Sequence, residues 1–292
     1  MNKNLEFLRA LLQLDSDESR AYFTFTFLQN GTIDLLPSEV LKNVEIFCKS
    51  NKYLDAARFA KLAKCKELAN DCYDLAIIHF EKLGKIANAA DIAKEAGMLG
   101  RAMTNYAKAG NTLQAAHIAE EVLLKEKAAA FFEQAKKPLE AARIYEELGQ
   151  QEKASSLYEK AGQTFDAFRT SRDAGKYEQA ANIWDKAGKP EAGAHHAKKH
   201  GLVQLADKLY EKAINKLVDA QNPTVEDYNN AAFLAKEAGW NNRAFEFYER
   251  AIRAAGSKEE RERMFGQAIR LCCETNQPQK AQAYKSLEAL FK

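Results

Sequence analysis

Residues 149–175 decide the fold, and they read GQQEKASSLYEKAGQTFDAFRTSRDAG. A glycine recurs every 13 residues in this stretch, and an alanine stands directly before the second and third of these glycines. The same grid holds Gly84, Gly97, Gly110, Gly149, Gly162, Gly175, Gly188 and Gly201, and it is interrupted at Leu123 and Lys136. Glycine supplies the positive φ with which many helices end. The period therefore predicts a series of helices of about 9 or 10 residues, each closed by a turn centred on a grid residue.

Small and aromatic residues recur at fixed positions within each 13-residue unit. Five residues after a grid residue stands a small residue, as in Ala89, Ala102, Ala154 and Ala180. Nine residues after it, alternate units carry an aromatic ring, at Tyr106, Phe132, Tyr158, Trp184 and Tyr210. Positions 5, 8, 9 and 12 of a unit share one helix face, which is predicted to be buried. Two units thus form a 26-residue helical hairpin, in which small residues let the helices approach and one ring fills the gap.

The second helix of such a hairpin carries Gly97, Ala102, Tyr106 and Ala109. The same pattern recurs at Gly149, Ala154, Tyr158 and Ala161, and at Gly239, Ala244, Tyr248 and Ala251. This pattern resembles the second helix of tetratricopeptide repeats over about residues 51–291, with the family's usual unit of about 34 residues shortened to 26. Strings such as YEKAG at this spacing are also similar to the degenerate helical arrays of coat-like trafficking proteins. The resemblance implies an all-α fold, a right-handed α-solenoid of antiparallel hairpins.

The two ends of the chain depart from the 13-residue period. Residues 1–50 hold only two alanines, and we expect helices at about 3–13, 17–29 and 38–49 that form an N-terminal helical cap. The alternation at Phe23–Phe27 is typical of a strand, but its helical surroundings favour helix. Residues 51–213 are predicted to form the short-helix array, in which the wider spacing before Gly84 indicates one longer second helix. Residues 214–292 are predicted to form longer hairpins and a cap, with helices at about 202–220, 225–237, 240–254, 258–274 and 277–291.

Composition excludes several classes of protein. The 43 Lys and Arg residues nearly balance 41 Asp and Glu residues, so the basic excess typical of nucleic-acid-binding domains is missing, and no nucleic-acid partner is predicted. Five cysteines without a C-x-x-C motif indicate a reduced, intracellular protein. No apolar run approaches the roughly 20 residues that span a bilayer, and the start of the chain lacks a signal-peptide pattern. We therefore expect a cytoplasmic protein without a transmembrane segment.

The sequence holds no recognisable catalytic or cofactor-binding motif. Phosphate-binding glycine loops, a G-x-S-x-G elbow and an H-E-x-x-H zinc helix are all missing, so neither an enzyme nor a cofactor is predicted. The alternative hypothesis is a metal-binding protein or metal-dependent enzyme that uses His195, His196 and His200. His196 and His200 stand four residues apart, a spacing that can place two imidazoles on one ion. Because both occupy inward positions of their unit, a packing role is favoured.

The tetratricopeptide resemblance implies a concave surface lined by the exposed faces of the first helices. Transferred to this sequence, the lining changes from mixed or acidic to basic along the array. Partner contacts are predicted at Arg143, Arg169, Arg172, His195, Lys198, Lys199, Asn230 and Lys236. Such a groove can hold an acidic peptide or helix, whereas the opposing interpretation is a solvated face whose charges keep a long surface soluble. The leading hypothesis is a non-enzymatic interaction scaffold or adaptor, in vesicle trafficking or in assembly of a bacterial or secreted-effector complex.

Overall fold

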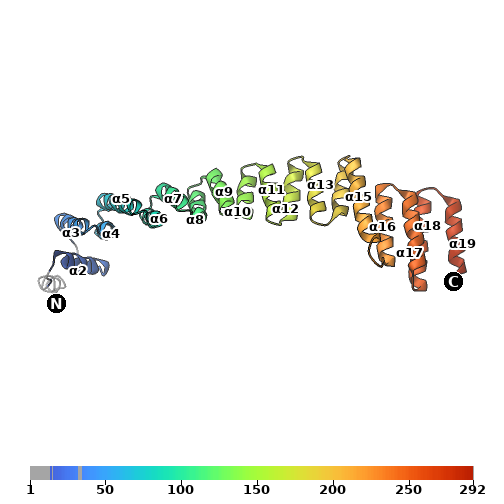
Figure 1. The fold of residues 1–292 in the computed structure, drawn as a ribbon, viewed down its shortest axis with the longest axis horizontal. Coiled ribbons are helices and arrows are strands. Elements are labelled where there is room, and N and C mark those ends of the chain that lie inside the picture. Colours follow the sequence, from blue (N-terminus) through green and yellow to red (C-terminus); the bar gives the residue numbers. More distant parts are fainter. Residues whose placement is uncertain (1–13, 15, 32–34, 292) are drawn as a thin grey trace. The chain divides into compact units, whose positions relative to one another are not determined.

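The computed structural model describes residues 14, 16–31 and 35–291. Within that part it contains eighteen helices, α2 to α19, and no strand (Figure 1). The chain divides into two compact units, residues 1–144 and 145–292, in each of which successive helices pack on their neighbours along the chain. The helix expected at 3–13 lies outside the described residues. None of the helices seen here is long and apolar enough to cross a membrane.

The first unit contains α2 to α9 and the start of α10. The bounds are α2 (Asp17–Gln29), α3 (Pro37–Lys49), α4 (Tyr53–Leu62), α5 (Lys66–Lys82), α6 (Ile86–Glu95), α7 (Leu99–Lys108), α8 (Thr112–Glu121), α9 (Lys125–Gln134) and α10 (Pro138–Glu147). From α6 to α10 every helix has ten residues, as the period predicts. The helix α5 has 17 residues, which confirms that the wider spacing before Gly84 lengthens this second helix by two turns.

The second unit continues with α11 (Gln151–Lys160), α12 (Thr164–Asp173), α13 (Tyr177–Lys186), α14 (Pro190–Lys199), α15 (Val203–Val218), α16 (Val225–Ala238), α17 (Asn241–Ala254), α18 (Lys258–Glu274) and α19 (Pro278–Leu290). Four ten-residue helices are followed by five of 13 to 17 residues. The lengthening predicted after Gly201 is therefore confirmed, and the predicted bounds agree with the structure to within about two residues.

Each short helix ends in a turn whose central residue has a positive φ. Gly97 has a φ of 76°, its backbone N–H donates to the carbonyl of Lys94, and the N–H of Met98 donates to the carbonyl of Ala93. This pair of bonds defines the Schellman motif, which satisfies carbonyls that the helix end leaves without partners. The two interruptions of the glycine grid keep the same conformation, because Leu123 has a φ of 60° and Lys136 a φ of 56°. The 13-residue period is thus a repeat of backbone conformation, and glycine is the usual residue at the centre of each turn.

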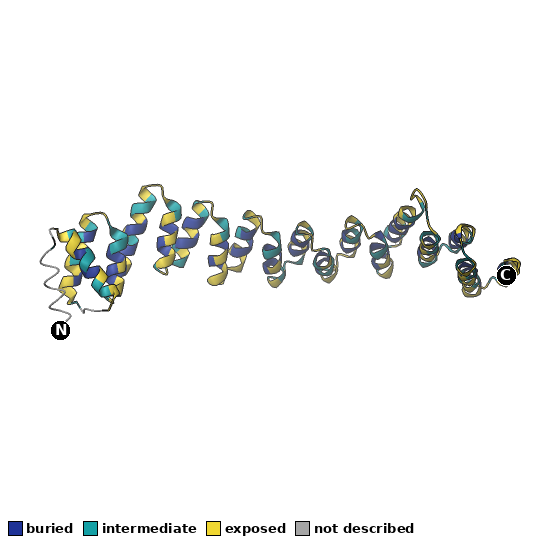
Figure 2. Cartoon of the chain, turned by 90° about the horizontal axis from the view of Figure 1, so that it is seen from below, coloured by how far each residue is buried: buried dark blue, intermediate teal, exposed yellow. Residues whose placement is uncertain are grey.

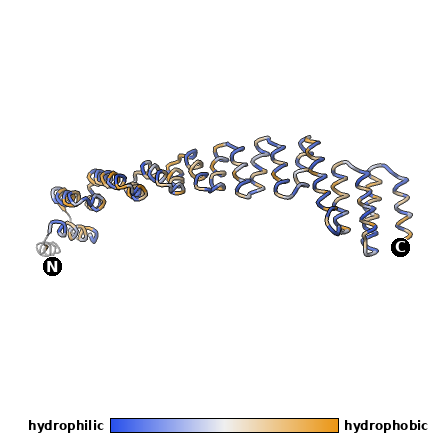
Figure 3. Tube along the Cα trace, viewed as in Figure 1, coloured by the Kyte–Doolittle hydropathy of each residue, from blue (hydrophilic) through white to orange (hydrophobic). Residues whose placement is uncertain are grey.

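Burial confirms the predicted inner face with one correction. In α6, positions 5, 8 and 9 are buried as expected, and position 6, occupied by Ala90, is buried as well. Position 12, occupied by Ala96, was predicted to point inward and is half-buried. The apolar face is wider than expected because each helix packs against both the preceding and the following helix, whereas position 12 is the C-cap at the helix end. Figure 2 shows the buried residues on the sides of the helices that face neighbours, and Figure 3 shows hydrophobic residues recurring along the helices.

The aromatic rings of the second helices pack in the core, as the sequence predicts. Tyr106, Phe132, Tyr158 and Tyr210 are buried, and Trp184 is half-buried. In each unit, hairpins with small faces and one ring stack on one another, so each unit is an all-α solenoid of tetratricopeptide-like hairpins.

The N-terminal aromatic stretch is helical. Residues 23–27 lie within α2, where the hydroxyl of Thr24 donates to the carbonyl of Arg20 at 2.8 Å. The ring of Phe25 lies 6.4 Å from that of Phe47 in α3 and 6.0 Å from that of Phe59 in α4, measured between centroids. Through these contacts α2 packs on α3 and on the first helix of the hairpin that follows.

Candidate partner-binding surface

The second unit contains a half-enclosed pocket of about 380 Å³ between α14, the end of α15 and α16. Its apolar walls are formed by Ala213, Leu217, Phe233 and Leu234. Its polar groups come from Glu191, His195, Lys216 and Asn230. Phe233 is 49% exposed although its neighbours in α16, Leu234 among them, are buried. An apolar pocket with a few convergent polar groups is the usual form of a binding site.

A difference in helix length creates this pocket. The helix α14 keeps the ten residues of the short array, whereas its partner α15 has 16. The ammonium of Lys216 donates to the carbonyl of Gly188 at 2.9 Å, so the end of α15 lies beside the turn that precedes α14. The last residues of α15 thus extend past the start of α14, and there Leu217 is half-buried in the wall of the pocket. The pocket lies where short hairpins give way to long ones.

His195 lies at the edge of the pocket and is held by its neighbours. Its Nδ1 lies 3.0 Å from the hydroxyl of Tyr210, and a carboxylate oxygen of Glu237 lies 3.9 Å from the same nitrogen. Burial raises the pKa of Tyr210 to about 12, so its hydroxyl stays protonated at neutral pH. When this hydroxyl donates to Nδ1, the neutral ring keeps its proton on Nε2 and can offer it to a ligand.

Tyrosine hydroxyls reach polar residues of other helices elsewhere in the array as well. In the second unit, Tyr158 donates to Glu146 at 2.8 Å and Tyr284 to Glu249 at 3.0 Å. In the first unit, the hydroxyl of Tyr73 donates to Glu95 at 2.9 Å. Sequence reasoning treated these rings as core alone and missed their hydroxyls. The choice of tyrosine over phenylalanine at these positions is the signal that would have revealed the contacts.

Several predicted partner-binding cations form ion pairs or hydrogen bonds within the second unit. Arg169 contacts Glu146 at 2.6 Å and 3.0 Å, and this contact lowers the pKa of the Glu146 carboxyl. Further contacts join Arg172 to Asp173 at 2.8 Å, Lys236 to Glu274 at 2.5 Å, and Lys198 to the carbonyl of Glu237. The pairs with carboxylates reduce the positive charge that the surface offers to a partner, whereas Lys198, bonded to a neutral carbonyl, keeps its charge.

The remaining predicted contacts differ in their surroundings. Lys199 is exposed, and no ion pair involves it within the described part of the chain. Asn230 is exposed at the pocket, so the structure brings it together with His195. Arg143 is exposed and belongs to the first unit, whereas the helices that form the pocket belong to the second.

The three clustered histidines do not converge on one point. His195 bonds to Tyr210, whereas His196 is buried among aromatic rings and His200 stacks on Tyr177. Over the described ranges, no group of three or more His, Cys, Asp or Glu residues is placed to hold a metal ion. The metal hypothesis built on these residues is therefore not supported.

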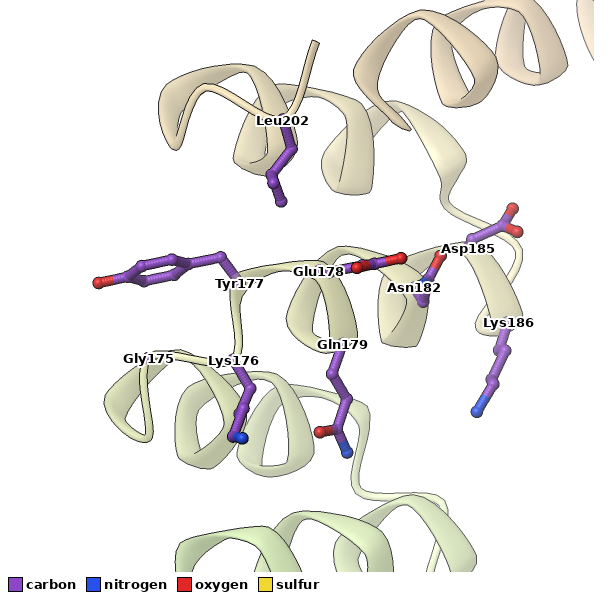
Figure 4. Close-up of a pocket in the computed structure, with 9 residues that line it drawn as sticks. All are labelled: Gly175, Lys176, Tyr177, Glu178, Gln179, Asn182, Asp185, Lys186 and Leu202. Atoms are coloured by element: carbon purple, nitrogen blue, oxygen red, sulfur yellow. The ribbon is translucent and has the colours of Figure 1, made fainter. Parts of the chain in front are cut away.

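A second surface depression, of about 690 Å³, lies along α13 and the start of α15 (Figure 4). Tyr177 and Leu202 contribute its apolar surface. Three of its four charged residues are paired within the unit, Lys176 with Glu152, Lys186 with Glu159 and Asp185 with Lys212, and the fourth, Glu178, is exposed. Although larger, this depression is open to solvent, so the pocket at α14 and α16 is the stronger candidate site.

Comparison with known proteins does not assign the chain to a family. No family model matches the chain, and no curated protein matches its sequence. Among solved structures, the chain is similar to BtubC (BKLC) from P. vanneervenii, with 18% identity over 85% of this chain and 90% of that chain and a TM-score of 0.26. It is also similar to a tetratricopeptide repeat protein from Parabacteroides merdae, with 15% identity over 80% of this chain and 98% of that chain and a TM-score of 0.24. Because both TM-scores are low, conclusions about the fold rest on the helices and turns described above.

Proposed function

We propose that the chain is a non-enzymatic protein-interaction scaffold or adaptor whose second unit holds a peptide or helical segment of a partner protein. The pocket between α14 and α16 carries this proposal. It combines an apolar wall with polar groups at its edge, and it leaves the large ring of Phe233 half in solvent. An aromatic residue in such a place is a typical anchor for a partner side chain.

The chemistry of the pocket suggests the kind of segment that would bind. An apolar side chain of the partner would pack against Phe233 and Leu217, and Asn230 would bond to its backbone. Lys199 and Lys216 favour an acidic flank on that segment. In this proposal Arg169 and Arg172 on α12 give up their ion pairs with carboxylates of this chain and contact a longer partner segment instead. A role in trafficking or in the assembly of a larger complex would follow from such binding.

Affinity capture from the native cell tests this proposal. The immobilised full chain is compared with Phe233→Ala, and with Phe165→Ala as a matched control, because Phe165 is another exposed phenylalanine, at 63%, and lies outside the pocket. We expect quantitative mass spectrometry to find proteins that the wild type and the control retain and that Phe233→Ala loses.

A charge reversal at Lys199 tests the acidic flank separately. Lys199→Glu should weaken capture at low salt and have a smaller effect at high salt, because exposed charges are screened. Equal capture by Phe233→Ala and the wild type would contradict the pocket as the binding site. An effect of Lys199→Glu that does not depend on salt would contradict the electrostatic part alone.

A further inference from the structure

His196 is a buried histidine whose ring has aromatic neighbours and lacks a hydrogen-bond partner on one nitrogen. Its exposed fraction is 9%, and the centroid of its ring lies 4.9 Å from that of Phe168 in α12, in an edge-on contact. The rings of Tyr177 and His200 lie 6.0 Å and 4.6 Å away. Within the part of the chain that the structure describes, Nε2 of His196 is buried and has no partner. Tyr177 also stacks on His200 at 3.7 Å, so one cluster joins α12, α13 and α14.

The charges that act on this ring are positive. Burial lowers the pKa of His196, and His200, Arg172 and Lys199 lower it further. Carboxylates on the neighbouring helices are engaged elsewhere, in the pairs Asp166–Arg169, Asp173–Arg172, Asp185–Lys212, Glu211–Arg243 and Glu237–His195. Glu178 on α13 is exposed, and Asp207 on α15 is half-buried. Asp207 stands at position 6 of its unit. Ala181 holds the same position in α13, where its backbone lies against the following helix. A proton on His196 would therefore lack a counter-charge among its described neighbours.

This environment couples protonation to opening of the cluster. In the packed state His196 holds a proton less readily than a histidine in water, whose pKa is 6.5. A state in which the ring has moved into solvent takes up the proton more readily. As pH falls below about 6.5, the opened state therefore gains population relative to the packed state, and above that pH the packing is fully stable.

We propose that the junction between α13 and α14 is an acid-labile joint in the second unit: protonation of His196 drives its ring out of the cluster with Phe168 and Tyr177 and loosens the packing of α12, α13 and α14. This joint needs no partner protein, so it stands independently of the proposed binding function. It would let mild acid change the local order of the array while hairpins that lack a buried histidine stay packed.

Amide hydrogen exchange of the full chain between pH 7.5 and pH 5 tests this joint, after correction for the intrinsic pH dependence of exchange. We expect protection in α12 to α14 to fall by up to about tenfold for each pH unit as the pH drops from about 6.5 towards the lower pKa of packed His196, and to level off below that pKa. His196→Phe keeps an aromatic ring and removes the proton site, so its protection should not change with pH. The control is His117→Phe, because His117 is 61% exposed and lies in the first unit. This control should behave as the wild type does.

Protection in wild-type α12 to α14 that is constant with pH would overturn the proposal, and so would a pH-dependent loss that persists in His196→Phe. If His196→Phe does not fold, nuclear magnetic resonance of the wild type decides the question. The His196 ring should titrate at a lower pH than a free histidine, and amide shifts in α12 and α13 should follow with the same midpoint. A ring that titrates as a free histidine does, or amide shifts that do not follow it, would also overturn the proposal.

Discussion

At the scale of single residues, the close approach of two helices explains why one unit carries glycine where the others carry alanine. Gly193 stands at position 5 of its unit, where the other units of the array carry alanine. A Cβ added to Gly193 would lie 2.5 Å from the carbonyl oxygen of Ala181 and 3.2 Å from a methyl group of Leu209. The first of these atoms belongs to the backbone of α13 and cannot rotate away. The helices α13 and α14 therefore approach too closely at this point for any side chain.

Gly193→Ala should destabilise the chain by roughly 1–3 kcal/mol, because the added methyl group forces α13 and α14 apart. Urea unfolding measures the effect. The matched control is Gly266→Ala in α18, where an added Cβ meets nothing within 4 Å. Alanine has the higher helix propensity, so this control should stabilise by about 0.5–1 kcal/mol. Shifts of the same sign in both variants would contradict close packing at Gly193.

At the scale of the helix and its closing turn, the backbone conformation stays the same where the residue type changes. Leu123 and Lys136 adopt the positive φ of the glycine turns, and Asn51 and Lys64 do so upstream, with φ of 58° and 61°. A residue with a side chain is strained in this region. The packing of the flanking helices must therefore impose the turn.

Glycine at the two interrupted grid positions should relieve this strain. Leu123→Gly and Lys136→Gly are each expected to raise the free energy of unfolding by about 0.5–1 kcal/mol, since the greater freedom of glycine in the unfolded chain offsets part of the gain. Thermal and urea unfolding measure it. The reciprocal variant Gly110→Ala, at a φ of 78° with no atom within 4 Å of the added Cβ, should lose about 1 kcal/mol from backbone strain alone. A neutral Gly110→Ala would show that the turn conformation is not what limits stability.

At the scale of the whole molecule, helices that pack on their sequence neighbours make stability local. Tyr158 is 4% exposed and packs within the second unit. Tyr158→Ala should cost on the order of 3 kcal/mol through the cavity that it leaves. Hydrogen exchange should show the lost protection in α11 and α12, whereas α4 and α5 of the first unit keep theirs.

A conservative variant separates the ring of Tyr158 from its hydroxyl. Tyr158→Phe keeps the packing and removes the bond to Glu146, so it should cost only about 1 kcal/mol. A thermal melt unchanged by Tyr158→Ala would refute the packing of rings between helices. Loss of protection spread evenly over both units would refute the local character of stability.

The sequence by itself determined the helix lengths, the positions of the turns and the ring in each hairpin. These features depend on local backbone preference and on the face that a short helix must bury, and both are written in residues close together in the chain. The buried position 6 escaped prediction because a helix buried on two sides has a wider apolar face than one buried on a single side.

Only the tertiary structure decided which charged side chains pair with one another within the chain and where a pocket forms. Arg169 meets a carboxylate 23 residues away, and the hydroxyl of Tyr210 meets His195 across 15 residues. No local pattern encodes such pairings, because they depend on how hairpins stack. The pocket at Phe233 likewise arises from the unequal lengths of α14 and α15, and an unequal length becomes an exposed apolar wall only when the two helices lie side by side.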